Sequence, residues 1–337
     1  MPDAHPGELC PCNQRTPSMS KNTVHIILFI FLVSLVCPDA KGSLQCLPGR
    51  NLPDSLADPG IQLKILSWNI GMLPLADLFK EKDGRPEAIA SALYHCHEYD
   101  IIVFEEAFTQ GARAVIAKKL RGLYPFAYGP VNGHRLSMRV SSGIWILSKI
   151  PLEIRKEIEF TESAGFDAFA RKGAVLLEGQ FRNSVFQLIA THLQDDEYPQ
   201  SIRECQLRQI YNELLLPYSD PLTPQIICGD FNTDEKVAVN YLGMLSILNA
   251  EDGEISGQLK VSFDDESNDA FRSPHPDPRR IDYMLTRNGN LIRHISRDIT
   301  VLRSGWGDGK QYLSDHNAIE AEVLFSNRDY LTRAGGK

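Results

Sequence analysis

The segment "IICGDFNTDE" (226–235) is a core-forming run that ends in polar groups. Its apolar residues stop at Gly229, and Asp230, Phe231 and Asn232 follow directly. A carboxylate and an amide at the end of a rigid strand can serve hydrogen bonding and proton transfer, but the same residue types are common in turns and helix caps. The segment alone leaves both interpretations open.

Polar side chains also close or precede other apolar runs along the chain. Taken one at a time, most are explained more simply as turns, caps or hydrogen-bonded core histidines. Asp282 is harder to explain in this way, because a charge between Ile281 and Tyr283 requires a buried partner such as an imidazolium. Each group costs free energy if it is buried unpaired, so the set predicts one shared site. The candidates are Asn69, Glu105, Glu106, His192, Asp230, Asn232, Asp282, Asp315 and His316.

The elements that must position these residues alternate between short strands and longer helices. β-Branched and aromatic runs bounded by turn residues predict strands, and apolar residues at helical spacing predict helices. The runs 141–149, 172–181 and 184–193 look like consecutive hairpins or meanders, whereas helices separate other strands, so the pattern favours mixed sheets in one domain. Strands are predicted over 63–70, 100–108, 141–149, 172–181, 184–193, 224–232, 280–287 and 317–325, and helices over 85–97, 110–123 and 201–216.

The N-terminal region has the pattern of a secretory signal peptide. Lys21 precedes an unbroken apolar run over 26–33, and small residues up to Gly42 suit a cleavage site. The apolar run is shorter than the roughly 20 residues of a spanning helix, although a membrane anchor and a lipid-modified Cys37 are alternatives. We therefore expect a secreted protein. The predicted organisation is an extension and signal peptide (1–42), a lead segment (43–61), one domain (62–325) and a C-terminal tail (326–337).

Charge and cysteine content restrict the function further. The net charge of −8 argues against a stable nucleic-acid partner held by a basic face, although an acidic protein can recruit divalent cations to bind phosphate. Cleavage near Gly42 would leave Cys46, Cys96, Cys205 and Cys228, which allow up to two disulfides in an oxidising compartment. Burial in a helix and in an apolar run favours free thiols at Cys96 and Cys228.

Six motifs in this order resemble the endonuclease/exonuclease/phosphatase superfamily, the fold of deoxyribonuclease I. They are "SWNI", "FEEAF", "THLQ", "GDFN", "RRIDYML" and "LSDH", and the resemblance covers about 62–325. Within that superfamily, "RKGAVLLEG" (171–179) and "THLQDDEY" (191–198) are similar to segments of neutral sphingomyelinases. The resemblance implies a four-layer α/β sandwich, with two packed mixed β-sheets flanked by helices. It also implies a phosphodiesterase of the phospholipase C type that releases phosphocholine from sphingomyelin or a related choline phospholipid.

The resemblance assigns Mg²⁺ as the cofactor, with Mn²⁺ or Co²⁺ as possible substitutes. Glu106 and Asn69 are the implied metal ligands, and hard oxygen ligands of this kind suit Mg²⁺. Glu106 is preferred over Glu105 because the family pattern places the ligand two residues before Phe108. Glu105 is then expected to point to the opposite side of the strand. Asp315 is expected to contact the metal or its bound water.

The resemblance also assigns the proton transfers. His316 is the implied general base for the attacking water, and Asp282 orients and stabilises its imidazolium. Asp230 is expected to hold the water in line. Asn232 and His192 are expected to donate hydrogen bonds to the phosphoryl oxygens.

The remaining expectations concern the lipid surface and the rival functions. Lys172 and Trp306 are possible substrate or membrane contacts, and Trp306 has a packing alternative. The segment 304–316 is shorter than the aromatic hairpin that bacterial relatives insert there, so another surface such as 128–140 is a candidate for lipid contact. The rivals are a secreted Mg²⁺-dependent endonuclease of the same fold and a catalytically silent binding module. We expect a monomer.

Overall fold

The computed structural model describes residues 62–73, 84–96, 98–133, 139–274 and 276–326. The chain divides into two units, Met1–Ser43 and Leu44–Lys337, and every described residue belongs to the second. The predicted signal peptide (1–42), lead segment (43–61) and nearly all of the tail (326–337) lie outside the described residues. No helix in the described part of the chain is both long and apolar enough to span a membrane.

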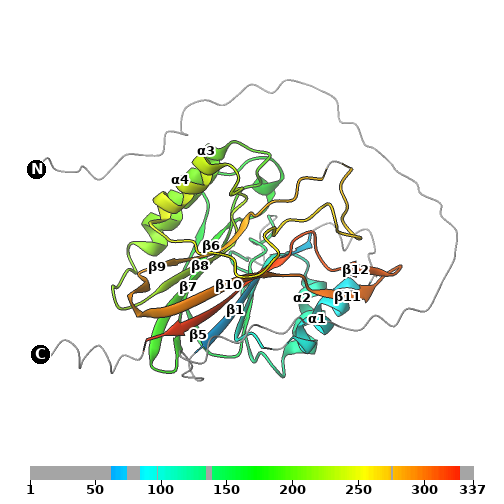
Figure 1. Ribbon diagram of the computed structural model, residues 1–337, viewed down its shortest axis with the longest axis horizontal. Coiled ribbons are helices and arrows are strands. Elements are labelled where there is room, and N and C mark those ends of the chain that lie inside the picture. The colour runs from blue at the N-terminus through cyan, green and yellow to red at the C-terminus, as the bar shows by residue number, and fades with distance from the viewer. Residues whose placement is uncertain (1–61, 74–83, 97, 134–138, 275, 327–337) are drawn as a thin grey trace, which may run out of the picture. The chain divides into compact units, whose positions relative to one another are not determined.

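Two mixed β-sheets form the centre of the second unit (Figure 1). The first has the order β10-β13-β1-β2-β4-β3, and β1 pairs with β2 in parallel and with β13 in antiparallel fashion. The second has the order β5-β6-β7-β8-β9, and only its β7–β8 pair is parallel. The strands of the first sheet are β10 (Ile292–Thr300), β13 (Ala318–Phe325), β1 (Gln62–Met72), β2 (Ile101–Ala107), β4 (Trp145–Ser148) and β3 (Phe126–Tyr128). Those of the second are β5 (Leu152–Glu159), β6 (Gly173–Phe181), β7 (Ser184–His192), β8 (Gln225–Asp230) and β9 (Asp282–Arg287).

The period-2 alternation of strand side chains decides which core each residue joins. On β1, Leu63 and Ile65 face the second sheet and join the cluster between the sheets, where Leu188 of β7 and Ile226 of β8 also lie. Trp68, of opposite parity, is buried in a different cluster. Because β1 is apolar on both faces, it is a central strand covered from both sides.

Helices cover the outer face of each sheet. Helices α1 (Arg85–His95) and α2 (Gln110–Leu120) pack on the first sheet, where Ile89 and Ile116 share a core with Trp68. Helices α3 (Gln200–Ile210) and α4 (Ala238–Leu248) and the π-helical segment η4 (Tyr211–Leu215) pack on the second, through Leu207 and Met244. Figure 1 shows these two helix pairs on opposite sides of the sheets. The predicted four-layer α/β sandwich is therefore confirmed.

The structure differs from the sequence prediction mainly at edge strands. The predicted strand 141–149 is not part of a meander with 172–181 and 184–193, because β4 belongs to the first sheet whereas β6 and β7 form a hairpin in the second. Strands β3, β5, β10, β11 (Arg303–Trp306) and β12 (Lys310–Tyr312) and helix α4 were not predicted. Edge strand β5 reads LEIRKEIE and has exposed charged residues in succession, so it lacks the apolar run that marks a buried strand.

The cysteines partly contradict the expectation. Cys228 is a buried free thiol, as predicted. Cys96 is disulfide-bonded, so the predicted free thiol there is wrong, and Cys205 is disulfide-bonded as well. Cys96 is the C-cap residue of α1 and is only partly buried, so the helix end leaves its sulfur accessible to a partner.

Candidate active site

Three of the predicted site residues lie in one row across the second sheet. His192 at the end of β7 is in register with Asp230 at the end of parallel β8, and Asp230 is in register with Asp282 at the start of β9. Because β9 is antiparallel to β8, its first residue lies at the edge where β8 ends. Three side chains distant in sequence therefore meet at one edge of the sheet.

The first sheet brings its polar groups to the same place. Asn69 on β1 is in register with Glu105 on β2, and the pairing becomes irregular between Asn69 and Met72. His316 precedes β13, which is antiparallel to β1, so it approaches from the same edge. The cluster thus lies where the ends of both sheets meet, with Asn69, His192, Asp230, Asp282 and His316 all at most 8% exposed.

Asp230 lies at the centre of this cluster. Its Oδ2 accepts a hydrogen bond of 3.0 Å from Asn69 Nδ2 and lies 3.6 Å from His192 Nε2 and 3.8 Å from His316 Nε2. Burial, followed by the charge of Asp282, raises the pKa of Asp230 to about 7. At neutral pH this carboxyl is therefore close to its titration point, whereas an exposed aspartate is fully ionised.

His316 is paired with Asp282. Its Nδ1 lies 2.9 Å from Asp282 Oδ2, which leaves Nε2 facing Asp230. Burial alone would lower the pKa of His316, but the charge and hydrogen bond of Asp282, together with Asp230 and Asp315, raise it well above the usual value. The pair has the arrangement of a base and the carboxylate that orients it, and the predicted convergence of these residues is observed.

Glu106 reaches the site because of its backbone. Its φ is 53°, in the left-handed region that a non-glycine residue rarely adopts. Its carboxyl is 4.0 Å from His192 Nε2, and burial and the charge of Asp315 raise its pKa. Such a backbone conformation costs free energy and persists only where the surrounding structure enforces it. The fold is therefore less stable than it would be with a relaxed backbone at Glu106, and this conformation turns the carboxylate toward the site.

Glu105 is more deeply buried than Glu106, and the charges of Asp282, Asp230 and His316 act on it. It is fully buried and accepts a hydrogen bond of 2.7 Å from Ser67 Oγ, while its other oxygen has no hydrogen-bond partner. Burial raises the pKa of Glu105 well above its usual value. A fully buried carboxyl group in that position is less accessible to a cation than Glu106, whose side chain is partly exposed.

His192 and Lys172 form a second buried pair. Lys172 Nζ lies 3.0 Å from His192 Nε2, and it also donates to the carbonyl of Leu193 and pairs with Asp167 Oδ2, both at 2.8 Å. Burial, with the charges of Lys172 and His316, lowers the pKa of His192 well below its usual value, so this imidazole is neutral. Lys172 is 4% exposed, and it contacts the site through His192 rather than from an open surface.

The "GDFN" segment has its shape because of the neighbouring strand. Gly229 has a φ of +138°, and a Cβ there would lie 1.8 Å from the carbonyl oxygen of Thr191 on β7. Asn232, with a φ of 46°, turns back so that its N–H donates to Asp230 Oδ1 at 2.9 Å and its Nδ2 donates to the Leu193 carbonyl at 3.2 Å. The second proton of that amide is available to a ligand.

Ser314 and Asp315 connect the final strand to the first sheet. Ser314 Oγ donates to the Asn69 carbonyl at 2.7 Å and lies 3.2 Å from Asp315 Oδ1. Asp315 is partly exposed and raises the pKa of Glu106 by its charge. The two carboxylates therefore repel each other, and a cation near them would relieve that repulsion.

Trp306 is a packing residue. It lies in the β11–β12 hairpin, is 8% exposed, and donates from Nε1 to the carbonyl of Tyr312 at 2.7 Å. Its ring packs against Phe271 and Arg85. The membrane-contact interpretation of Trp306 is therefore wrong for this structure, and the packing alternative is supported.

The arrangement of charges fits a bound divalent cation. Glu106 and Asn69 offer hard oxygen atoms, and burial together with neighbouring carboxylates raises the pKa values of Glu106 and Asp230, which a bound cation would lower again. Asp230, Asp282 and His316 also place possible ligand atoms within 4.8 Å of one another. However, the close atoms of Asp282 and His316 already pair with each other, so Glu106 and Asn69 fit Mg²⁺ better.

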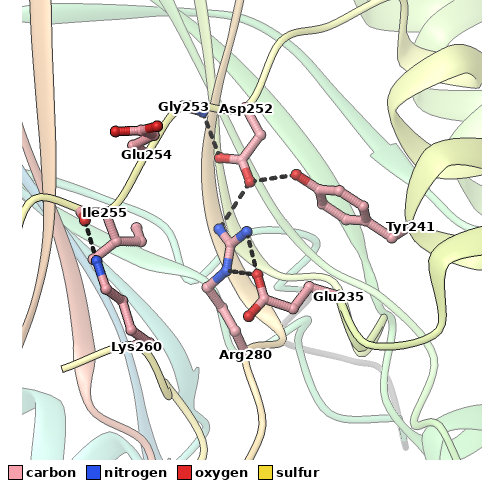
Figure 2. Close-up of a pocket in the computed structure, with 8 residues that line it drawn as sticks. All are labelled: Glu235, Tyr241, Asp252, Gly253, Glu254, Ile255, Lys260 and Arg280. Atoms are coloured by element: carbon pink, nitrogen blue, oxygen red, sulfur yellow. Dashed lines mark hydrogen bonds and ion pairs between the residues drawn. The ribbon is translucent and has the colours of Figure 1, made fainter.

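A cavity of about 590 Å³ lies beside the cluster and is lined by different residues (Figure 2). Arg280 points into it between Glu235 and Asp252, with Nε 2.6 Å from Glu235 Oε2 and Nη1 2.8 Å from Asp252 Oδ2. Because Glu235 follows "GDFN" and Arg280 precedes Asp282, these ion pairs join the two segments that carry Asp230 and Asp282. The cavity contains structural ion pairs, and the catalytic cluster does not line it.

Several supporting residues carry no sequence pattern that would predict them. Ser262 Oγ accepts the N–H groups of both Ile281 and Asp282 at 3.0 Å and so fixes the start of β9. Phe263 packs edge-on against the His316 ring, with centroids 5.2 Å apart. Both residues belong to a loop without regular periodicity, and only the folded chain brings them to the site.

Comparison with known proteins shows a consistent set of similarities. The model of the Endonuclease/Exonuclease/phosphatase family matches residues 66–316. Sphingomyelinase C 2 of Leptospira interrogans is 27% identical over 317 residues, which cover 86% of this chain and 50% of that protein. The chain thus spans about half the length of this curated relative.

Solved structures share the fold. A crystal structure of beta toxin from Staphylococcus aureus has a TM-score of 0.69 and 24% identity, and covers 79% of this chain and 100% of that one. A mutant of the same toxin with bound magnesium ions has a TM-score of 0.68 and 22% identity, with the same coverage. Because the family match covers most of the chain, this protein belongs to the Endonuclease/Exonuclease/phosphatase family.

Proposed function

We propose that this protein is a Mg²⁺-dependent phosphodiesterase that hydrolyses sphingomyelin to ceramide and phosphocholine. The observation that carries the proposal is the His316–Asp282 pair beside Asp230, which faces Glu106 and Asn69 from the other sheet. Family membership and the similarity to bacterial sphingomyelinases support this activity and substrate. A binding module does not require this arrangement of acid, base and amide. An endonuclease of the same fold would use the same arrangement, so the experiment below separates it from the proposed function.

The residues of the chain divide the work as follows. His316 removes a proton from the attacking water through Nε2, and Asp282 stabilises the resulting imidazolium. Asp230, within 4 Å of both imidazoles, holds that water in line with the bond to ceramide. As water adds to phosphorus, the P–O bond to ceramide breaks. The departing ceramide oxygen takes a proton from solvent, the His316 imidazolium returns its proton to solvent, and phosphocholine is released.

Donors and cations stabilise the charge that develops on the phosphoryl oxygens. In this proposal the second proton of the Asn232 amide serves one of these oxygens. Lys172, which donates to His192 Nε2, supplies a buried positive charge beside it. Glu106 and Asn69 would hold the Mg²⁺ ion, which when bound supplies positive charge to the phosphoryl oxygens and the departing oxygen. Asp315 completes this acidic side of the site.

We also propose that the protein is secreted and acts as a monomer at a membrane surface. The signal-peptide pattern at the N-terminus and the disulfide-bonded Cys96 and Cys205 support an oxidising location. Free sphingomyelin is sparingly soluble, so the enzyme must meet it in a bilayer.

The decisive experiment compares two phosphodiesters under one set of conditions. Purified protein is incubated with sphingomyelin vesicles and with plasmid DNA, each with Mg²⁺ and with a chelator. We expect phosphocholine release that the chelator abolishes, and intact DNA. Nicked DNA without phosphocholine release would replace the proposed function with that of a nuclease.

A further inference from the structure

Two aromatic side chains protrude from a single 3₁₀ turn, η3 (Gly165–Phe169). Phe166 is 89% exposed and Phe169 is 68% exposed, which makes them the most exposed aromatic residues of the described chain. An exposed phenyl ring keeps a large apolar surface in water, and that surface is favourable to bury in a membrane or an interface. The turn therefore presents a small apolar surface of the kind that binding uses.

The turn is held rigidly. Gln194 accepts a hydrogen bond from Ala164 N at 2.8 Å and donates to Asp167 Oδ2 at 2.8 Å. Asp167 also accepts from Asp195 N at 2.9 Å. Gly165, with a φ of +56°, lies so close to Tyr198 that a Cβ would be 1.7 Å from the phenolic oxygen. These contacts fix the turn, so the exposure of the two rings follows from a defined structure.

The turn borders the active site. Asp167 Oδ2 pairs with Lys172 Nζ at 2.8 Å, and Lys172 lies 3.0 Å from His192 Nε2. Two contacts thus connect the turn that carries Phe166 and Phe169 to an imidazole of the catalytic cluster. A surface that docked on these rings would lie beside the site that must receive the substrate.

We propose that Phe166 and Phe169 insert into the surface of a zwitterionic, choline-rich bilayer and so bring the active site to the lipid. The inference rests on the proposed function, because that function places the substrate in such a bilayer. It also gives a role to exposed aromatic residues on the rim of the site, since the hairpin residue Trp306 is buried.

The charges near the turn favour a neutral lipid surface over an anionic one. Asp195 and Glu197, which follow Gln194, are exposed and acidic. The nearby Arg139 and Arg171 are both paired with Glu159. Without unpaired basic residues among these neighbours, binding should depend on the apolar rings rather than on attraction to anionic head groups.

The test separates binding from catalysis. Vesicles of phosphatidylcholine and sphingomyelin are sedimented with protein in the presence of a chelator, so that no turnover is required. The variant Phe166→Ser/Phe169→Ser should bind roughly 10- to 100-fold more weakly than the wild type. The control Val239→Ser/Leu242→Ser removes two exposed apolar residues of α4, and it should bind like the wild type. Anionic vesicles should bind the wild type no more tightly than zwitterionic ones.

Activity on two substrates completes the test. Hydrolysis of sphingomyelin in vesicles by the turn variant should fall by about the same factor as its vesicle binding. Its hydrolysis of a short-chain sphingomyelin below the critical micelle concentration should equal that of the wild type. The second result also shows that the variant is folded. Phe166→Trp should bind vesicles as tightly as the wild type, and its tryptophan fluorescence should shift to shorter wavelength on vesicles. Unchanged vesicle binding by the turn variant, or equal loss in the α4 control, would overturn the inference. If the wild type binds vesicles but hydrolyses neither vesicle sphingomyelin nor the short-chain sphingomyelin, the proposed function is refuted instead.

Discussion

Replacing Asp230 with asparagine should stabilise the fold above neutral pH while it abolishes hydrolysis. Asp230 is 2% exposed, and burial and the charge of Asp282 raise its pKa from an ordinary value of 3.8 to about 7. A carboxyl with a raised pKa binds its proton more tightly in the folded state, so its ionisation opposes folding. Below pH 3.8 the group is protonated in both states. As pH rises from 3.8 to about 7 the penalty grows, and above pH 7 it is complete.

The size of the effect follows from that difference. A pKa of about 7 in place of 3.8 corresponds to roughly 4 kcal/mol of lost stability at pH 8. Asparagine keeps the shape and can still accept the hydrogen bond from the Asn232 N–H. The hydrogen bond that Asn69 Nδ2 donates to the Asp230 carboxylate is lost or weakened when an amide replaces the carboxylate, which costs about 1 kcal/mol. A net gain of about 3 kcal/mol remains, or roughly 6–12 °C in Tm for a domain of this size.

The assay is thermal unfolding of wild type and Asp230→Asn from pH 4 to pH 8 in the presence of a chelator. The Tm of the variant should exceed that of the wild type at pH 8, and the excess should disappear toward pH 4. Mg²⁺ should narrow the difference at pH 8, because a cation offsets the buried charge. Hydrolysis of sphingomyelin by the variant should fall by at least about 100-fold, the size typical of one acid or base group. A variant that is less stable than the wild type at pH 8 would refute the electrostatic reasoning.

Four further outcomes are expected. Glu106→Gln should reduce hydrolysis by about 100-fold or more and make the rate less dependent on Mg²⁺ concentration. Glu105→Gln should retain activity, and assays over a range of Mg²⁺ concentrations distinguish the two variants. His316→Ala should fold normally, as circular dichroism would show, and lose at least about 100-fold in kcat/KM. At low Mg²⁺, kcat/KM should fall as pH drops, because the pKa of His316 is raised well above its usual value and the base must be deprotonated. Saturating Mg²⁺ should move this acidic limb to lower pH, and pH profiles at the two Mg²⁺ concentrations test this. Arg280→Ala should cost about 3 kcal/mol in denaturant unfolding, because it removes the cation that pairs with the buried Asp252 carboxylate, which then keeps only its bonds to Tyr241 and Gly253.

Matched controls define what would contradict these expectations. Equal losses in Glu106→Gln and Glu105→Gln would mean that the backbone conformation does not select the metal ligand. Wild-type rates in His316→Ala would remove its role as the base. Arg280→Lys keeps one charge without the forked geometry, and it should be intermediate in stability between wild type and Arg280→Ala.

The residues of the site were predictable from the sequence because of where they stand on strands. Asn69, His192 and Asp230 close apolar runs that can only be central strands, and the topology of such strands gathers their ends at one edge. The choice of Glu106 over Glu105 came from the family pattern. Period-2 alternation separates the two side chains, but it does not predict the positive φ that turns Glu106 toward the site.

The remaining features depend on contacts that no local pattern encodes. Burial of Trp306 depends on Phe271 and Arg85, which are distant in sequence. The glycines beside Trp306 therefore allowed it to be interpreted as an exposed anchor as well as a packing residue. Strand β10 alternates apolar and charged residues only loosely, because its partner β13 supplies the pairing that defines it. Ser262 reaches the start of β9 through a loop, and its role becomes visible only when that loop is placed.

The distribution of buried charge explains why the site lies between two sheets rather than on one. The second sheet supplies Asp230 and Asp282, and the first supplies Glu105 and Glu106, so four carboxylates meet where the two sheets pack. Packing of the apolar faces against each other buries these acids, and burial, followed by the charges of neighbouring carboxylates, raises the pKa values of Asp230, Glu105 and Glu106. A divalent cation relieves that repulsion, and this is the physical reason that a stable hydrophobic core can maintain a site that is unfavourable without its metal.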